Sequence, residues 1–268
     1  MQALETGMGT DRRYTIALCK GAALVDETRT LVQHWTSGEE IGEFVDRVLH
    51  DNVLARATAY RTKDIVRRVF ARRFLVPTDA PARHLKKLMD NGLPRKLFSE
   101  VLFLYAARAD RLLCDFTTEV FWSACRRRRS ILTRDDVVGF IAEATDAGRI
   151  EDAWSAKVQV KIARAVLSTL RDVGFLREER RGHREIVPYH LSDEGVAYLA
   201  HELHDTGLSD SAMCEHPDWR LFGLDRGRVL GRLDNLGEDK GMLVQRAGSV
   251  VQITWKYESA EELIDGLA

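Results

Sequence analysis

The stretch from Trp154 to Tyr198 constrains the fold more than any other part of the chain. At 100° per residue, one side of a helix gathers apolar side chains: Trp154, Val158, Ile162, Val166, Leu170 and Val173. The side facing away carries Lys157, Lys161, Arg164, Ser168 and Arg171. Gly174 is expected to end the helix, because glycine tolerates the left-handed conformation that closes a last turn. The pattern predicts an amphipathic helix over 154–173 with one basic face.

Two short runs typical of strands follow this helix, FLREE and HREIVPYHL, joined by Arg180-Arg181-Gly182. An apolar helix face, a cationic opposite face and a hairpin with a basic tip occur in this order in a winged helix. In that fold the helix enters a DNA groove and the hairpin lies against the neighbouring backbone. We therefore expect the exposed helix face to line the groove and the hairpin arginines to reach phosphates. The first group is Lys157, Lys161, Arg164 and Ser168, and the second is Arg180, Arg181 and Arg184. A solvated basic face is the alternative interpretation.

The charge of the chain is distributed unevenly. The formal net charge is −1 over 268 residues. Residues 56–134 contain 19 Lys and Arg against 7 Asp and Glu, and residues 157–184 contain 8 against 3. From residue 188 to the end the balance reverses, with 7 against 15. A basic middle of this kind presents a local positive field to polyanions, even in a protein that is nearly neutral as a whole.

A second basic segment, RATAYRTKDIVRRVFARR, covers residues 56–73. Its cations, set against Asp64 alone, are Arg56, Arg61, Lys63, Arg67, Arg68, Arg72 and Arg73. At helical spacing Arg61, Arg68 and Arg72 share one stripe, while Ile65, Val69 and Phe74 are available for packing. Like charges this dense repel one another, so the segment needs a counter-charge. Phosphate and carboxylates from neighbouring helices are both left open.

The chain is expected to be mainly α-helical, with winged helix-turn-helix modules and a small α/β C-terminal part. We predict a helical domain at 1–130 with a helix-turn-helix-like segment at 39–76, a winged-helix domain at 131–206 and an acidic helix–hairpin–helix segment at 207–268. Helices are predicted at about 15–36, 39–50, 61–76, 81–90, 95–127, 133–148, 154–173, 225–236 and 260–267. The pairs Ser37 with Glu40 and Thr133 with Asp136 each fit a capping box. A hairpin is predicted around Ala247-Gly248.

Several classes of protein are disfavoured. The longest apolar run is seven residues, 101–107, whereas a membrane span needs ~20. Four separated cysteines and the lack of a secretion signal favour the cytoplasm. Glycine-rich phosphate loops and a nucleophile elbow are missing, so neither enzymatic activity nor a cofactor is expected. His201 and His204 lack the spacing of a zinc-protease helix, which argues against a metal site. The run at 126–129 fits a solvated helix end better than a phosphate clamp.

The order and spacing of longer strings resemble the BrxA family of BREX bacteriophage-exclusion systems. These strings are YTIALCKGAALVDETRTLV, NVLARATAYRTKDIVRRVFARRFL, LFLYAARADRLLCDFTTEVFW, REIVPYHLSDEGVAYL, HPDWRLFGL and VVQITW. The resemblance as a whole covers about nine-tenths of the chain. The resemblance implies a non-enzymatic, helical, winged-helix DNA-binding protein that serves defence against phage alongside other BREX components.

We therefore expect double-stranded DNA to be the partner, bound mostly through phosphate and with modest sequence preference. Two alternatives stay open. In the first, the chain is a scaffold subunit whose basic middle pairs with its acidic C-terminal part or with acidic partner subunits. In the second, the helical half binds RNA in the manner of an antitermination factor, a likeness that the resemblance also carries. The sequence leaves open whether the protein forms a homodimer.

Overall fold

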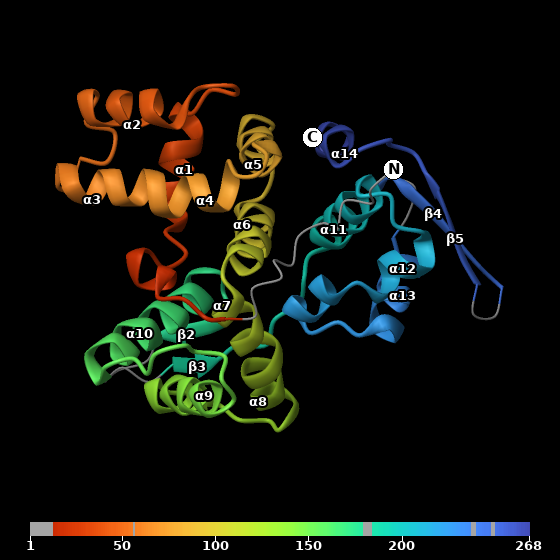
Figure 1. Cartoon of the computed structure of the whole chain (residues 1–268). Coiled ribbons are helices and arrows are strands. Elements are labelled where there is room, and N and C mark those ends of the chain that lie inside the picture. Colours follow the sequence, from red (N-terminus) through yellow and green to blue (C-terminus); the bar gives the residue numbers. More distant parts are fainter. Residues whose placement is uncertain (1–12, 56, 179–183, 237–239, 248–249) are drawn as a thin grey trace. The chain divides into compact units, whose positions relative to one another are not determined.

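The computed structural model describes residues 13–55, 57–178, 184–236, 240–247 and 250–268. The chain is mainly helical with two small antiparallel sheets, which confirms the predicted mainly α class with a small α/β part (Figure 1). The predicted winged helix-turn-helix modules stay a prediction. It divides into two compact units. The large unit holds the described part of residues 7–83 and 102–189, and the small unit holds residues 84–101 with the described part of 190–268. The predicted boundaries after residues 130 and 206 stay a prediction.

The large unit begins with short helices: η1 (Ala17–Lys20), α1 (Val25–His34) and α2 (Ile41–His50). The predicted helix over 15–36 is interrupted, because Gly21 is extended and Leu24 adopts a left-handed φ of 50° before α1. Glu40, rather than Ser37, is the N-cap of α2, and no side chain caps it. The capping box expected there is therefore wrong.

The second basic segment forms one continuous helix of three labelled parts. These parts are α3 (Ala59–Asp64), the π-helix η2 (Ile65–Phe70) and α4 (Ala71–Phe74). Thr58 caps the start, since its Oγ1 accepts from the amide of Arg61 at 3.2 Å. Ile65, Val69 and Phe74 are buried, as predicted. The wider π-helical turn shifts the phase of every residue after Asp64 relative to an α-helix.

α5 (Ala80–Asp90) and α6 (Arg95–Ala109) each contribute residues to both units. The predicted helix over 95–127 breaks at Asp110. Asp110 has an extended backbone and caps α7 (Arg111–Asp115), because its Oδ1 accepts from the amide of Leu113 at 3.2 Å. The π-helix η3 (Phe116–Phe121) and α8 (Trp122–Arg126) continue the chain.

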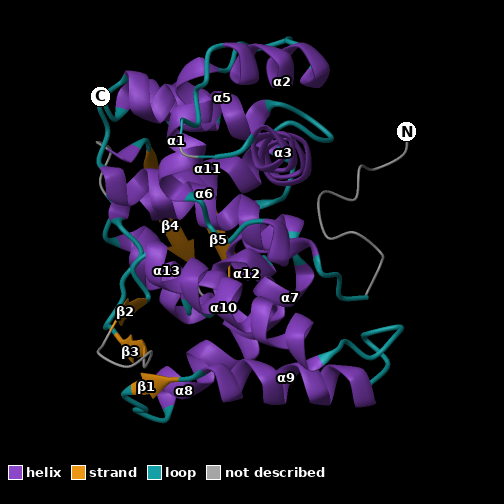
Figure 2. Ribbon diagram, turned by 90° about the vertical axis from the view of Figure 1, so that its left-hand side faces the viewer, coloured by secondary structure: helices purple, strands orange, loops and turns teal. Residues whose placement is uncertain are grey.

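The last part of the large unit runs strand, helix, helix, hairpin. β1 (Ile131–Leu132) leads to α9 (Arg134–Asp146), which begins with the predicted capping box of Thr133 and Asp136. α10 (Ala156–Asp172) is followed by Gly174 at φ 88°, and then by β2 (Leu176–Glu178) and β3 (Arg184–Ile186). The three strands pair antiparallel in the order β1-β3-β2, and they lie side by side next to α8 (Figure 2).

Aromatic rings fill the core of the large unit. Phe175, directly after α10, stacks on Phe121 at 5.1 Å between ring centroids and contacts Phe103 edge-on at 5.0 Å. Phe70 lies between Phe44 and Phe74 in a second group, which joins η2 to α2 and α4. These contacts fix the hairpin module and the basic helix within one unit.

The small unit packs helices beside a two-stranded ladder. Its elements are α11 (Asp193–Asp205), α12 (Asp210–Glu215), η5 (Pro217–Phe222), α13 (Arg226–Asp234), β4 (Met242–Ala247), β5 (Val250–Trp255) and α14 (Ala260–Gly266). β4 and β5 pair antiparallel, which confirms the hairpin predicted around Ala247-Gly248. Ser192 caps α11 and accepts from the amide of Gly195 at 2.9 Å.

Candidate nucleic-acid interface

The burial pattern of α10 follows the predicted amphipathic phase. The buried side is formed by Ile162, Ala163, Val166, Leu167, Thr169 and Leu170. Lys157, Lys161 and Arg164 are exposed on the opposite side, while Ser168 is half-buried. Because buried and exposed positions alternate with the helical repeat, α10 is anchored along one side and presents the other to solvent.

The exposed cations of α10 find no carboxylate partner in the part of the chain that the structure describes. Lys157, Lys161 and Arg164 make neither an ion pair nor a side-chain hydrogen bond with any residue that the structure describes. The Lys161 ammonium lies close enough to Cys19 to offset part of the rise that burial causes in the pKa of that thiol. The N-terminal half of α10 is therefore a positively charged surface whose counter-charge does not come from the described chain.

Arg184 of the hairpin differs from the exposed cations of α10, because it has a carboxylate partner. Arg184 pairs with Glu178 at 2.9 Å across the β2–β3 ladder, and its side chain is only 16% exposed. Glu178 also accepts from Arg171 at 2.8 Å, and Arg171 in turn donates to Ser168 Oγ at 3.1 Å. Strand register sets Glu178 directly opposite Arg184, so this arginine already has a carboxylate partner. Its expected contact with phosphate stays a prediction. Ser168 is engaged by a neighbour on its own helix.

Three further predicted positions lie outside the described residues. They are Arg56 at the start of the second basic segment, and Arg180 and Arg181 between β2 and β3. Their expected contacts with phosphate stay a prediction.

Several cations of the second basic segment are used inside the large unit. Arg61 donates to the backbone carbonyl of Lys20. Arg73 is 8% exposed and donates to the carbonyls of Ala22 at 2.8 Å and Gly21 at 2.9 Å. Burial lowers the pKa of Arg73 to about 10. These arginines hold the chain at 20–22 against the basic helix, and the expected DNA contact of Arg61 stays a prediction.

The rest of the segment forms one exposed face. Arg68 pairs with Asp64 at 3.3 Å, and Arg72 donates to the carbonyl of Ala109 at 3.4 Å. Lys63 and Arg67 are exposed and form no ion pair within the described ranges. Tyr60 lies on this face with 72% of its surface exposed. Tyr60 was not predicted as a site residue, although its place inside a run of arginines and lysines was a usable signal.

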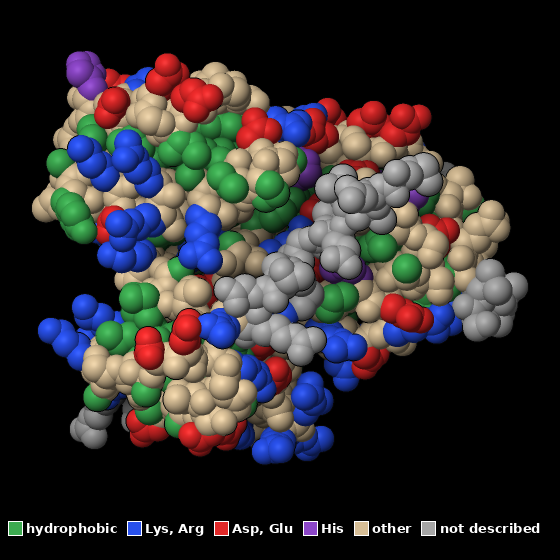
Figure 3. Space-filling model, in the orientation of Figure 1, with side chains coloured by type: hydrophobic (Ala, Val, Ile, Leu, Met, Phe, Trp, Pro, Cys, Tyr) green, Lys and Arg blue, Asp and Glu red, His purple; other side chains and the backbone are tan. Residues whose placement is uncertain are grey.

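The two basic surfaces share a neighbour in η1. Residues of η1 pack against both α10 and η2. Lys20 accepts from Arg61 through its carbonyl, and the adjacent Cys19 lies near Lys161. Figure 3 shows Lys and Arg side chains over α3–α4 and over α10, with the surface of the large unit hollowed between them. This arrangement suits a ligand that touches both helices.

A further group of arginines follows α8. Arg126, Arg127 and Arg128 are exposed and have no ion-pair partner in the described part of the chain. Arg129 is held by the Asp136 carboxylate through two hydrogen bonds of 2.8 and 3.0 Å. Only one arginine of this run is therefore neutralised by a described residue.

The small unit offers a contrast. The arginines of α13 all have carboxylate partners within that unit: Arg226 with Glu215 at 2.9 Å, Arg228 with Asp225 at 3.8 Å and Arg232 with Asp193 at 2.8 Å. Lys240 pairs with Glu194 and Arg246 pairs with Asp234. The described part of the acidic C-terminal segment thus neutralises most of its cations, with Arg220 and Lys256 exposed and without an ion pair to a described residue. α13 itself lacks the uncompensated charge of α10.

The histidines considered for a metal site are packed among aromatic rings. His201 is buried, hydrogen-bonds the carbonyl of Ala197 at 2.9 Å and contacts Trp255 edge-on, while His204 stacks on Trp255. Burial lowers the pKa of His201 to about 4. Within the described ranges, no group of three His, Cys, Asp or Glu side chains could hold a metal ion. Each helix of the described residues is too short or too polar to traverse a bilayer.

Comparisons with known proteins place the chain in a family. The BrxA family model matches residues 12–202, so the strings HPDWRLFGL and VVQITW lie beyond the matched span. No curated protein matches the chain. The fold is similar to the crystal structure of an uncharacterized protein from Magnetospirillum magneticum, with a TM-score of 0.60 and 18% identity over 78% of this chain and 98% of that one. Because the family model covers well over half of its length, this chain belongs to the BrxA family and is a BREX-associated phage-defence protein.

Proposed function

We propose that the large unit binds double-stranded DNA, chiefly through phosphates, and that its last part is a winged helix. The order α8, β1, α9, α10, β2, β3 with strands arranged β1-β3-β2 supports this proposal. In a winged helix the second helix of the pair enters a groove and the hairpin flanks it. α10 is that second helix, and its exposed side carries the uncompensated cations.

One observation carries the proposal. Five exposed cations on two elements of the large unit have no carboxylate partner among the described residues: Lys63, Arg67, Lys157, Lys161 and Arg164. The arginines of α13, which also precede a hairpin, are all paired. An uncompensated cluster needs an external anion, and the regular phosphates of a duplex supply one at each contact.

Sequence preference is expected to be modest. Gln159 is the one amide side chain among the exposed and half-buried positions of α10, and its Nε2 donates to the carbonyl of Trp154 at 2.8 Å. Bidentate recognition of adenine by Gln needs that amide group to donate to the base. The remaining exposed groups are cations, which contact phosphate more than they read base edges. Affinity should therefore vary little among duplexes of different sequence.

A salt titration tests the proposal. Anisotropy of a labelled duplex of about 20 base pairs is measured over a series of salt concentrations, and log K is plotted against log[salt]. Five phosphate contacts predict a slope of roughly −4 to −5. A flat plot would rule out phosphate-driven binding.

Charge reversal locates the surface. Lys161→Glu with Arg164→Glu should weaken binding to every duplex alike and make the slope shallower by roughly 2. The control is Arg228→Glu with Lys256→Glu, which changes net charge equally on exposed positions of the small unit. If both folded double variants lose affinity equally, the effect comes from net charge and α10 is not the contact surface.

Within phage defence we propose a non-enzymatic role, in which the DNA-bound protein works with other BREX components. Two outcomes would favour other functions. Stable capture of BREX components that survives nuclease treatment, together with no duplex binding, would favour a scaffold. Preferential binding of structured RNA over duplex DNA of equal length would favour the RNA-binding alternative.

A further inference from the structure

Tyr60 is the most exposed of the large hydrophobic side chains in the described part of the chain. It is 72% exposed, whereas Val76, Ile16 and Leu243 are 56%, 47% and 44% exposed. A single exposed hydrophobic residue is ordinary in a soluble protein and needs no explanation by itself. The residues around Tyr60 indicate whether it has a binding role.

The surroundings of Tyr60 are cationic. Tyr60 and Lys63, three residues apart in α3, lie on one side of the basic helix, and Arg67 is exposed one turn further on, in the π-helix η2. The single acid of the helix, Asp64, lies on the buried side, where it pairs with Lys20 and Arg68. Tyr60 therefore stands beside two cations that no described carboxylate neutralises.

A phenol ring among cations fits one kind of anion particularly well. Phosphates satisfy the cations, and the ring offers a flat surface on which a nucleic-acid base can stack. Bases inside a duplex already stack on each other, so the ring needs an unpaired base. A protein partner is disfavoured, because the exposed neighbours on the helix are Lys63, Arg67 and Arg68. The exposed Ala59 adds only a small apolar side chain, which is too little for a buried interface core.

We propose that Tyr60, Lys63 and Arg67 form a binding site for unpaired nucleotides. Tyr60 stacks on a base, while Lys63 and Arg67 contact the phosphates that flank it. The ligand class is then DNA in which a single-stranded segment adjoins a duplex. This step rests on the proposed function, since duplex binding by the same unit brings the unpaired segment to this helix.

The test compares three labelled DNA ligands. These are a blunt duplex of about 20 base pairs, the same duplex with a tail of about eight nucleotides, and the tail strand alone. A 2-aminopurine in the tail reports base stacking by loss of its fluorescence. Wild-type protein should bind the tailed duplex about 5- to 150-fold more tightly than the blunt one, the range expected for stacking of one base. The 2-aminopurine fluorescence should fall on binding.

Two substitutions of Tyr60 separate the effect of its aromatic ring on binding from any effect on folding. Tyr60→Ala should remove the preference for the tail and the loss of fluorescence, while blunt-duplex affinity changes by less than about two-fold. Tyr60→Phe keeps the ring and should behave as wild type. Lys63→Gln with Arg67→Gln should weaken tail binding and make its salt slope shallower by roughly 1.4. Because Tyr60 is exposed, all variants are expected to keep the wild-type unfolding temperature.

The outcomes distinguish this inference from the proposed function. Salt-dependent binding of the blunt duplex without a tail preference would overturn the Tyr60 site and leave the proposed function intact. Binding of the tail strand that depends on Tyr60, without any duplex binding, would overturn the proposed function and leave the Tyr60 site intact. Equal loss of blunt and tailed binding in Tyr60→Ala would place Tyr60 in the duplex interface and also overturn the inference.

Discussion

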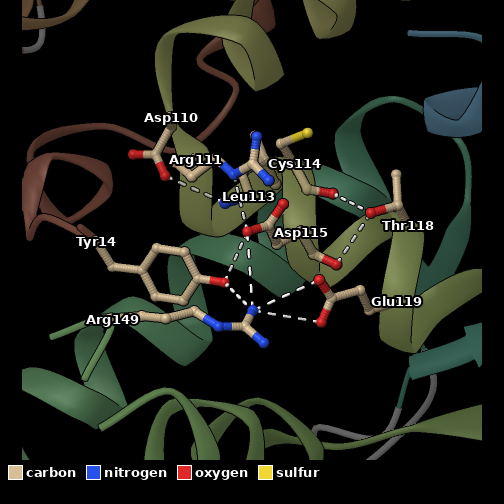
Figure 4. Close-up of polar contacts among 9 residues, drawn as sticks. All are labelled: Tyr14, Asp110, Arg111, Leu113, Cys114, Asp115, Thr118, Glu119 and Arg149. Carbon is tan, nitrogen blue, oxygen red and sulfur yellow. Dashed lines mark hydrogen bonds and ion pairs between the residues drawn. The ribbon is translucent and has the colours of Figure 1, made fainter. Parts of the chain in front are cut away.

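The hydroxyl of Tyr14 donates a hydrogen bond of 2.9 Å to Oδ2 of Asp115, a carboxylate 101 residues further along the chain (Figure 4). Arg149 donates to the same hydroxyl at 2.9 Å, and Arg111 donates to the same carboxylate oxygen at 2.9 Å. Burial raises the pKa of Tyr14 well above its usual range, so the hydroxyl keeps its proton. This network fastens the start of the described chain to α7 and to the loop that follows α9 inside the large unit.

Tyr14→Phe is expected to lower the free energy of unfolding by about 1–3 kcal/mol, because Asp115 is buried and loses one of its donors. Chemical denaturation measures this change. Tyr60→Phe is the matched control, since it removes an exposed hydroxyl and should alter stability by no more than about 0.5 kcal/mol. Equal stability of the two variants would mean that the network does not hold the N-terminal segment.

Gly195→Ala is expected to destabilise the protein, although alanine is the better helix former. A Cβ at Gly195 would lie 2.5 Å from Oε2 of Glu100 and 2.8 Å from Cδ1 of Leu191. Glu100 is 2% exposed and accepts from the amide of Ser192 at 2.9 Å, so it has little room to move. Overpacking of this kind costs about 1–3 kcal/mol.

The matched control for Gly195→Ala is Gly231→Ala in α13. No atom of the described residues lies within 4 Å of a Cβ placed at Gly231. The substitution there should stabilise the helix by about 0.5–1 kcal/mol. Thermal unfolding of the two variants should therefore shift in opposite directions, and a rise in unfolding temperature for both would contradict the close contact with Glu100.

His201 makes stability depend on pH. Its pKa in the folded protein is lowered to about 4 by burial, below the ordinary value of 6.5. The unfolded state therefore binds the proton more readily between these values. The stabilisation is complete above pH 6.5 and is lost as the pH falls toward 4, by about 3 kcal/mol in total. His201→Gln should flatten the pH dependence of the denaturation midpoint in this window.

Much of the fold could be predicted because local patterns decide it. The phase of α10, the capping box at Thr133 and the stop at Gly174 depend on residues within one helix turn, and all three are present. The breaks at Leu24 and Asp110 could not be predicted. Leu24 holds a left-handed backbone that leucine rarely adopts, and Asp110 interrupts a stretch with no change in hydrophobic pattern.

The exposure of the cations at the candidate site could be predicted from the sequence, but their ion-pair and hydrogen-bond partners could not. Helical phase was enough to place Lys157, Lys161 and Arg164 on the surface. Whether a cation stays uncompensated depends on tertiary contacts, such as the carbonyl of Lys20 that receives Arg61. Some ion pairs could nevertheless have been predicted from the sequence, since Asp64 and Arg68 are four residues apart on one helix.

Glu178 restrains the positive charge at the base of the hairpin, and its removal should strengthen DNA binding. The Glu178 carboxylate pairs with both Arg171 and Arg184, at 2.8 and 2.9 Å. Glu178→Gln removes the negative charge that competes with phosphate, so the affinity for a blunt duplex should rise about two- to five-fold at low salt. The log–log salt slope should steepen by up to roughly 1.

Glu143→Gln supplies the control for Glu178→Gln, since it neutralises an exposed carboxylate of α9 that makes no ion pair with a described residue. A gain in affinity confined to Glu178→Gln would show that the hairpin lies against the DNA backbone, because only a nearby charge changes both affinity and salt slope. Equal gains in the two variants would indicate a response to net charge alone. No gain in either would place the β2–β3 hairpin outside the DNA contact, which would then consist of α10 and the basic helix.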